Sequence, residues 1–334
     1  MQQGVLWFLL SFVSIFSSLV FAEEMEPNTR QMWVTDELVN KKVEEFKDHA
    51  KRGDVDSIKN AMIGLSLPQQ EAVRFLLLQK IEKENILITQ PMASYIKTLS
   101  LIPPAYQSRH IGEGYEFTTP AFAYPSIANR ILRKWQYEQK ILNFVLAVER
   151  RELNLEHWLN EGTPTENQLR EKLLVEEMDG LSPPAVEFLV EQVVQADNKI
   201  IFWLPSTSVM VRLARESADA RVYKMLWRMR TDKNSQQELF RLMENVDIGS
   251  LAFIMDASAN PSLNGEVVKF LTSLKPLPND VKAFLIESLS TKEKDRALFV
   301  AEELSKQGYN RWLQQLVNTN KKVNSKAIKQ AISN

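Results

Sequence analysis

The chain repeats one short apolar phrase: Ala72-Val73-Arg74-Phe75-Leu76, Ala185-Val186-Glu187-Phe188-Leu189, Val267-Val268-Lys269-Phe270-Leu271 and Val281-Lys282-Ala283-Phe284-Leu285. Three of the four copies follow a proline within a few residues. The separations from Phe75 to Phe188 and from Phe188 to Phe284 are each about three periods of roughly 30–40 residues, the length of a helical hairpin. Because one hairpin leaves its apolar face exposed, we expect several hairpins to stack.

Around these copies, amphipathic helices are expected to follow one another from residue 164 to residue 318. Apolar residues recur at helical spacing in 164–179, 183–197, 207–231 with a break near Ser217, 234–245, 247–258, 262–274, 278–289, 291–307 and 309–318. This array resembles the HEAT-type α-solenoids. The resemblance implies an all-α fold, either a right-handed α-solenoid or an irregular array of helical hairpins, after an N-terminal signal segment.

Residues 35–125 are expected to form further helical hairpins, with helices that begin near Thr35, Asp54, Pro68 and Pro91. The segment His49–Lys59 resembles the turn between the paired helices of ankyrin-type repeats, which implies a helical hairpin there. Residues 103–125 are rich in aromatic side chains and lack helical spacing, so they are interpreted as an irregular loop. A long connecting helix and a short helix are predicted in 126–163.

The composition agrees with a helical class. Only 10 glycines and 14 prolines occur in 334 residues, too few for a fibrous or disordered chain. The formal net charge of −1 gives no overall basic field that would favour nucleic acid as a partner. From Lys306 onward the chain has lysine and arginine but no acid. Residues 319–334 are therefore predicted to be a solvated basic tail. The alternative is that this tail makes a weak contact with a membrane surface.

The first segment predicts export. An apolar run over residues 5–22 ends in Val20-Phe21-Ala22 and is followed by acids, the pattern of a signal peptide cleaved after Ala22. The run is also near the length that spans a bilayer, so the alternative is an inner-membrane protein anchored by residues 5–22. The absence of cysteine and of Asn-x-Ser/Thr acceptors in the sequence favours a periplasmic location. Residues 23–34 are predicted to be a linker.

No motif in the sequence predicts catalysis, a metal or a cofactor. His49, His110 and His157 lack the spacing of metal ligands, and Gly112-Glu113-Gly114 lacks the remaining residues of a phosphate-binding loop. We therefore expect a protein that is not an enzyme. The alternative is a peptidoglycan-active hydrolase or lytic enzyme that uses Glu113 as its acid, because a glutamate in an aromatic cleft can protonate a leaving group.

Two segments are candidates for binding a partner, because aromatic side chains and arginine are enriched at interfaces. One is the 103–125 loop, with Tyr106, Tyr115, Phe117, Phe122 and Tyr124. The other is Arg221–Arg230, a basic helix face with Arg221, Lys224, Trp227 and Arg228. The expected function is that of an exported, non-enzymatic α-helical scaffold or adaptor. Its partner would be another envelope protein or component, for example in envelope assembly or secretion.

Overall fold

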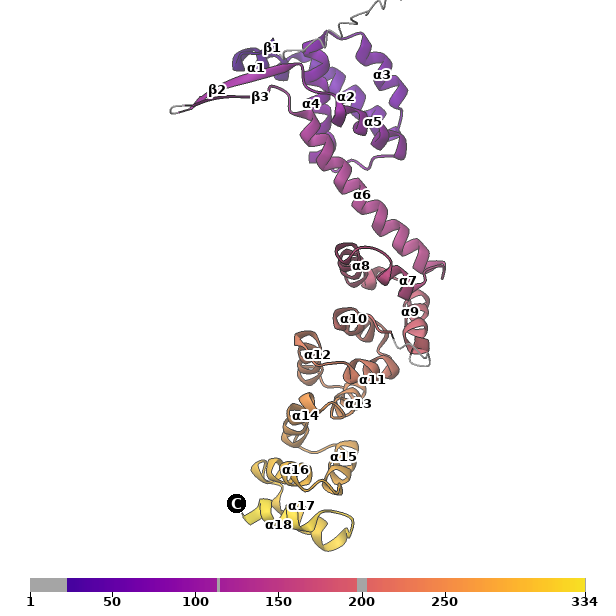
Figure 1. The fold of residues 1–334 in the computed structure, drawn as a ribbon, viewed down its shortest axis with the longest axis vertical. Coiled ribbons are helices and arrows are strands. Elements are labelled where there is room, and N and C mark those ends of the chain that lie inside the picture. Colours follow the sequence, from indigo (N-terminus) through magenta and orange to yellow (C-terminus); the bar gives the residue numbers. More distant parts are fainter. Residues whose placement is uncertain (1–22, 113–114, 197–202, 334) are drawn as a thin grey trace, which may run out of the picture. The chain divides into compact units, whose positions relative to one another are not determined.

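The computed structural model describes residues 23–112, 115–196 and 203–333 (Figure 1). This described part is predominantly helical, with eighteen α-helices, one short 3-10 helix and one three-stranded sheet. The all-α class expected from the sequence is confirmed at this level. The chain divides into an N-terminal unit, Met1–Lys140, and a C-terminal unit, Ile141–Asn334. Each unit has its own apolar core.

The N-terminal unit is a bundle of helices with a small sheet at its edge. Its helices α2 and α4 pack against each other, α1 packs on both, and α3 packs on α2 and α5. The elements are β1 Glu23–Glu24, α1 Pro27–Thr35, α2 Glu37–Arg52, α3 Val55–Ile63, α4 Leu67–Lys83, α5 Gln90–Leu101, β2 Tyr106–Gly112 and β3 Tyr115–Pro120.

The sheet overturns two expectations. The 103–125 segment contains a β-hairpin rather than an irregular loop, because β2 and β3 pair in antiparallel register with His110 opposite Phe117 (Figure 1). Residues 23–34 do not form a linker either. Glu23 and Glu24 form β1, which pairs in parallel with β2, and α1 begins at Pro27. Proline suits the first turn of a helix because it lacks the N–H that would be unpaired there.

A 26-residue helix, α6 (Tyr124–Glu149), contributes residues to both units. The C-terminal unit then continues through short helices. They are α7 Leu155–Asn160, α8 Pro164–Glu177, α9 Pro183–Ala196, α10 Thr207–Ser217, α11 Ala220–Arg228, α12 Lys233–Glu244, α13 Ile248–Ala257, α14 Pro261–Ser273, α15 Asn279–Leu289, α16 Lys294–Lys306, α17 Asn310–Thr319 and α18 Ser325–Ser333. None of the helices in the described residues is both long enough and apolar enough to span a membrane.

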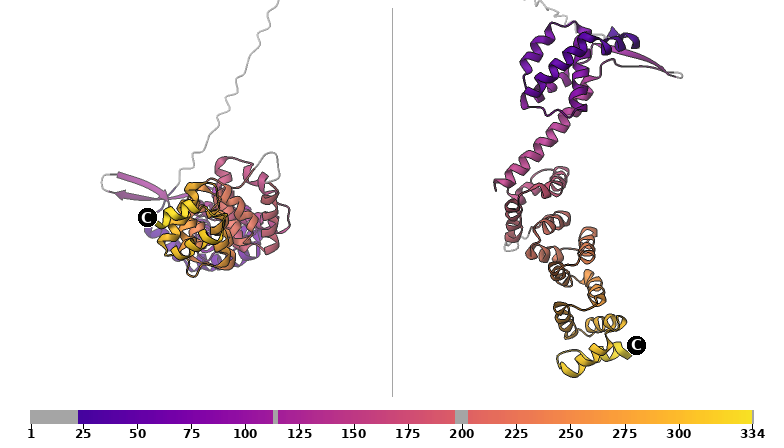
Figure 2. Two further views of the ribbon diagram at one scale, coloured as in Figure 1. Left: turned by 90° about the horizontal axis from the view of Figure 1, so that it is seen from below. Right: turned by 180° about the vertical axis from the view of Figure 1, so that it is seen from behind.

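Helices of the C-terminal unit pack mainly on the helices one and two places along the chain. Thus α10 contacts α9, α11 and α12, and α13 contacts α11, α12, α14 and α15. In Figure 1 the even-numbered helices α8 to α16 lie along one side of this unit and the odd-numbered helices α9 to α15 along the other, in chain order (Figure 2 shows the same order from behind). The core is therefore a series of local contacts between neighbouring helices.

One prediction in this unit is confirmed and another was wrong. The segment 207–231 breaks near Ser217 as expected, because Ala218 adopts a left-handed conformation (φ 49°) that ends α10, and Asp219 caps α11. Residues 319–334 are not a solvated tail throughout, because Ser325–Ser333 form α18, which packs on α16 and α17. Ala327, Ile328 and Ala331 are buried in that contact, so the lysines lie on the outer face of a packed helix.

Gly53 allows the turn between α2 and α3. It has a φ of 73°, and its N–H donates to the carbonyl oxygen of Ala50. A Cβ at this position would lie 2.6 Å from Oγ1 of Thr89. Gly64, at the end of α3, has a right-handed conformation, and its nearest atom to a Cβ would be the Ala61 carbonyl oxygen at 3.8 Å.

We expect Gly53→Ala to lower the free energy of unfolding by about 1–3 kcal/mol, because it adds both backbone strain and a steric clash. The matched change Gly64→Ala should alter it by no more than about 1 kcal/mol, in the stabilising direction, because alanine fits that backbone. Urea unfolding of the two variants measures the difference. Equal effects at the two glycines would contradict this account of the α2–α3 turn.

Candidate partner-binding site

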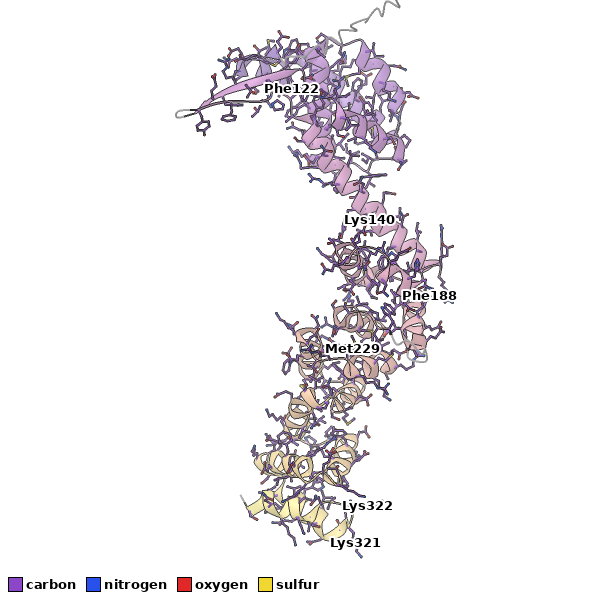
Figure 3. The ribbon with its side chains drawn as sticks, viewed as in Figure 1. Phe122, Lys140, Phe188, Met229, Lys321 and Lys322 are labelled. Atoms are coloured by element: carbon purple, nitrogen blue, oxygen red, sulfur yellow. The ribbon has the colours of Figure 1, made fainter. Side chains whose placement is uncertain are left out.

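The Arg221–Arg230 segment contributes to a pocket of about 660 Å³ in the C-terminal unit. The pocket lies where α11 ends and α14 begins, beside Met229, which is labelled in Figure 3. Its charged lining consists of three cations and one acid: Lys224, Arg228, Arg230 and Asp256. Because the cations are in excess, the pocket attracts negatively charged groups.

Helix α11 presents cations to the pocket because its other face is buried. Val222, Met225 and Leu226 are core residues, whereas Lys224 and Arg228 are exposed. The helix ends at Arg228, where the chain becomes extended at Met229 (φ −67°, ψ 161°). This change of direction places Arg230 beside the same pocket, outside the helical spacing of the other two cations.

Asn260 joins the two helix ends that border the pocket. Its side-chain oxygen accepts a hydrogen bond from the Ser262 N–H (3.0 Å) at the start of α14. Its Nδ2 donates to the carbonyl oxygens of Trp227 (2.9 Å) and Met229 (3.3 Å). One side chain thus caps α14 and holds the C-terminal end of α11, so the two walls of the pocket keep a fixed spacing.

The pocket also has an apolar wall. Trp227 is only 2% exposed, and its Nε1 donates to the Phe253 carbonyl oxygen at 3.0 Å. Met229, Ala259 and Pro261 lie along the same lining. A ligand that fits this site would therefore combine negative charge with apolar groups.

Behind the pocket, a buried carboxylate connects three helices. Glu238 of α12 is fully buried, and its two oxygens accept hydrogen bonds from Arg215 of α10 (2.5 Å), Tyr223 of α11 (2.8 Å) and Arg241 of α12 (2.6 and 2.9 Å). Burial alone would raise the pKa of Glu238, but the hydrogen bonds from Arg241, Arg215 and Tyr223 outweigh it, so the pKa lies below its usual value. The carboxylate is ionised and fully paired.

Tyr223 links the buried Glu238 carboxylate to the apolar wall of the pocket, because its hydroxyl donates to Glu238 and its ring packs on Trp227. Its ring stacks on Phe253 of α13, with centroids 4.2 Å apart, and on Trp227 at 5.9 Å. Burial, followed by the neighbouring Glu238 carboxylate, raises the pKa of Tyr223, so the phenol stays protonated and donates. The position of Trp227 is therefore set by the Tyr223 ring on its own helix, by the Phe253 carbonyl of α13 and by Asn260, which caps α14.

The structure brings together only part of the residue set predicted for this segment. Lys224 and Arg228 line the pocket. Trp227 also lines it, but its side chain is almost completely buried. Arg221 does not line the pocket: its guanidinium pairs with Asp219 (2.6 Å) and Glu187 (3.3 Å). Arg230 also lines the pocket. It lies in the same basic segment, but because it follows the end of α11, the helical spacing of Lys224 and Arg228 did not include it.

The aromatic residues of the 103–125 segment separate into two groups. Tyr115 and Phe117 are exposed on β3, and the Phe117 ring lies 5.9 Å from Tyr115 and 5.2 Å from His110. The other three, Tyr106, Phe122 and Tyr124, are buried in the core of the N-terminal unit. Their prediction as contact residues was wrong, because they pack against the helices.

Burial of Tyr124 accompanies a second buried acid, Glu71 of α4. One Glu71 oxygen accepts hydrogen bonds from the Ala105 N–H (2.7 Å) and the Tyr124 hydroxyl (3.4 Å), while the other has no partner among the described residues. Burial raises the pKa of Glu71, and burial together with Glu71 raises the pKa of Tyr124 to about 12. Glu71 therefore differs from Glu238 in its partners: Glu238 is paired with two guanidinium groups, whereas no ion pair to a cation is formed by Glu71 among the described residues.

The three histidines each have a different neighbour. His49 contacts Asp54 (2.8 Å), His110 contacts Thr119 (2.9 Å) and His157 contacts Glu161 (3.1 Å). Within the described ranges, no group of three or more His, Cys, Asp or Glu side chains could hold a metal ion. Glu113, the candidate acid of the hydrolase alternative, lies outside the described residues.

Comparison of the chain with protein-family models, with curated proteins and with solved structures finds no match. The site is therefore interpreted from its geometry. It is a basic pocket with one apolar wall, and buried hydrogen bonds fix the helices around it. These features are typical of a binding site for an acidic ligand that also carries apolar groups.

We expect Glu238→Gln to destabilise the C-terminal unit by about 2–3 kcal/mol at pH 7, because Arg215 and Arg241 lose their shared carboxylate. A lowered folded-state pKa gives stability that is present above the unfolded pKa and is lost as the pH falls through the folded value. The cost of the substitution should therefore shrink between pH 7 and pH 3. Urea unfolding at both pH values tests this, and a cost that does not depend on pH would contradict it.

Glu71→Gln is the matched comparison in the N-terminal unit. Because the folded-state pKa of Glu71 is raised, the ionised form opposes folding as the pH rises through that value. The amide removes this penalty, so the variant should gain stability relative to the unsubstituted protein as the pH rises. The two substitutions should thus show pH trends of opposite sign.

Proposed function

We propose that this protein is an exported, non-enzymatic α-helical adaptor whose basic pocket binds an acidic segment of another envelope protein. The single observation that carries the proposal is the gathering of Lys224, Arg228 and Arg230 beside the Trp227 wall. The helical array acts as the scaffold for this pocket, in the manner of HEAT-like α-solenoids, and accessory roles in envelope assembly or secretion fit such a protein.

Local packing in the C-terminal unit supports the solenoid interpretation. Contacts between helices one and two places apart are what stacked helical hairpins require, since each hairpin buries its apolar face on the next. Such arrays bind partners along exposed surfaces whose residues do not determine the fold. Lys224, Arg228 and Arg230 meet that condition, because they are exposed while their neighbours on α11 form the core.

The charge pattern supports an acidic partner. Among the described residues, no carboxylate lies within ion-pair distance of Lys224 or Arg230, whereas Arg221 on the same helix already has two acidic partners. Asp256 offsets part of the positive charge and would repel a ligand that places its carboxylates at the α13 side of the pocket. The partner segment should therefore carry its acids toward α11 and an apolar side chain toward Met229.

The test is selection from a peptide array that covers bacterial envelope proteins, with the full chain as the probe. Peptides that combine Asp or Glu with an aromatic or aliphatic side chain should be selected, and the paired change Lys224→Ala and Arg230→Ala should weaken their binding by about tenfold or more. Arg221→Ala is the matched control, because it removes a cation from the same helix but outside the pocket. Equal losses in both variants, or no preference for acidic peptides, would contradict the proposal.

Export is tested by the mass of the mature protein. Cleavage after Ala22 should give an N-terminus at Glu23 in protein recovered from the periplasmic fraction. Intact-mass measurement of the purified chain decides between this and the anchored alternative. A mass that retains residues 1–22, with the protein in the membrane fraction, would favour the anchor and place the pocket at the membrane.

A further inference from the structure

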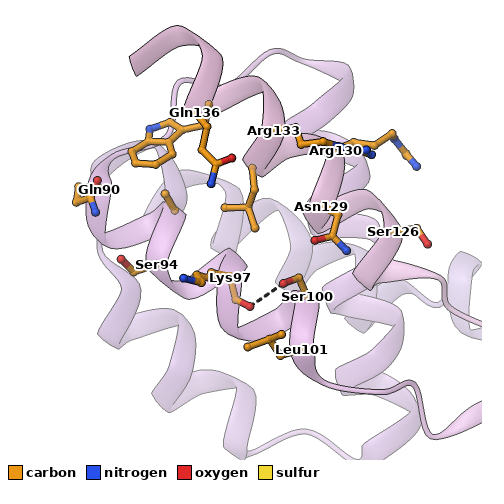
Figure 4. A pocket seen from close by; sticks show the side chains of 13 residues that line it. Gln90, Ser94, Lys97, Ser100, Leu101, Ser126, Asn129, Arg130, Arg133 and Gln136 are labelled. Carbon is orange, nitrogen blue, oxygen red and sulfur yellow. Dashed lines mark hydrogen bonds between the residues drawn. The ribbon is translucent and has the colours of Figure 1, made fainter. Parts of the chain in front are cut away.

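A second basic groove lies in the N-terminal unit, between α5 and α6. It has a volume of about 810 Å³ and is bordered by side chains from both helices (Figure 4). The cations in its lining are Lys97 of α5 and Arg130 and Arg133 of α6. None of the residues that line the groove is an acid. The lining therefore favours anions.

The nearby acids line a neighbouring, smaller cavity. Glu82 and Glu138 lie there beside Asn85, and this cavity shares Arg130 and Trp135 with the groove. Glu82 accepts hydrogen bonds from Nε (2.7 Å) and Nη2 (2.8 Å) of Arg130, which fixes the guanidinium and pairs its charge. Among the described residues, no carboxylate lies within ion-pair distance of Lys97 or Arg133.

The neutral lining adds a second chemical feature. Hydroxyl and amide side chains outnumber the cations: Ser94, Ser100, Ser126, Asn129, Gln90 and Gln136. Ser100 already donates to the Lys97 carbonyl oxygen (2.8 Å, dashed in Figure 4), so its oxygen is oriented and can accept. Trp135, which is half-buried, and Leu132 supply apolar surface. Donors, acceptors and a ring face together suit a ligand with many hydroxyls.

We propose that this groove binds a phosphorylated sugar, either free or as the headgroup of a glycolipid. Lys97 and Arg133 pair with the phosphate, and the hydroxyl and amide groups pair with the sugar hydroxyls. The groove volume is within the range of small-ligand sites, about 300–1,000 Å³. This site is independent of the pocket at α11, so it would survive a failure of the adaptor proposal.

The test titrates the full chain with glucose-6-phosphate, glucose and inorganic phosphate, and follows tryptophan fluorescence and heat. Glucose-6-phosphate should bind most tightly and change the Trp135 signal, which Trp135→Phe identifies by difference. The paired change Lys97→Ala and Arg133→Ala should weaken binding by about tenfold or more, because two charged phosphate contacts are lost. Lys41→Ala with Lys51→Ala is the matched control, since both are exposed on α2 outside the groove.

Vesicles distinguish the two sources of the sugar phosphate. Binding to phosphatidylcholine vesicles that contain phosphatidylinositol phosphate, but not to pure phosphatidylcholine or to glucose-6-phosphate, would assign a lipid headgroup, provided that Lys97→Ala with Arg133→Ala abolishes it. Inorganic phosphate that binds as tightly as glucose-6-phosphate would overturn the sugar assignment. Absence of binding to every probe, or an equal loss in the α2 control, would overturn the site itself.

Discussion

The buried carboxylate of Glu238 is the interaction on which the candidate binding site depends. Removal from water penalises its charge, and two guanidinium groups and one phenol compensate for that penalty. Because these partners come from α10, α11 and α12, the three helices have one arrangement that satisfies the charge. Tyr223 extends the constraint through its ring to Phe253 of α13. The cations of the pocket thus lie on a rigid support.

Glu71 and Glu238 illustrate how neighbours decide the state of a buried acid. Both side chains are almost completely buried, yet the pKa of one is raised and that of the other is lowered. Glu238 has two guanidinium partners, whereas Glu71 is paired with a phenol and a backbone N–H. Of the two buried acids, only Glu238 has cation partners, and it lies in the C-terminal unit that also contains the candidate partner-binding pocket.

Helical spacing predicted much of the fold, because the helices of the C-terminal unit bury one face on near neighbours in sequence. It failed where structure depends on distant residues. The β2–β3 hairpin was missed since its aromatic side chains suggested a loop, and β1 exists only through pairing with a strand some eighty residues away. In α18, the lysines concealed the spacing of Ala327, Ile328 and Ala331.

Of the residues in the candidate pocket, the sequence could predict only those that share one helix. Lys224 and Arg228 follow from the amphipathic pattern of α11, but Arg230 follows the helix end, and Asn260 and Asp256 come from other helices. The groove between α5 and α6 shows the same limit: Lys97 and Arg133 lie on separate helices, and neither has a signature that links it to the other. Sites of this kind form only when separate helices pack together, and the spacing of residues within one helix does not predict that packing.

The most direct measurement is site-specific photo-crosslinking in living cells, with the crosslinker at position 230 in one variant and at position 221 in another. The adaptor account predicts a discrete crosslinked product from position 230, with the attachment in an acidic segment of another envelope protein. Position 221, which lies outside the pocket, should give no such product. A product of the same size from both positions, or none from position 230, would contradict the account.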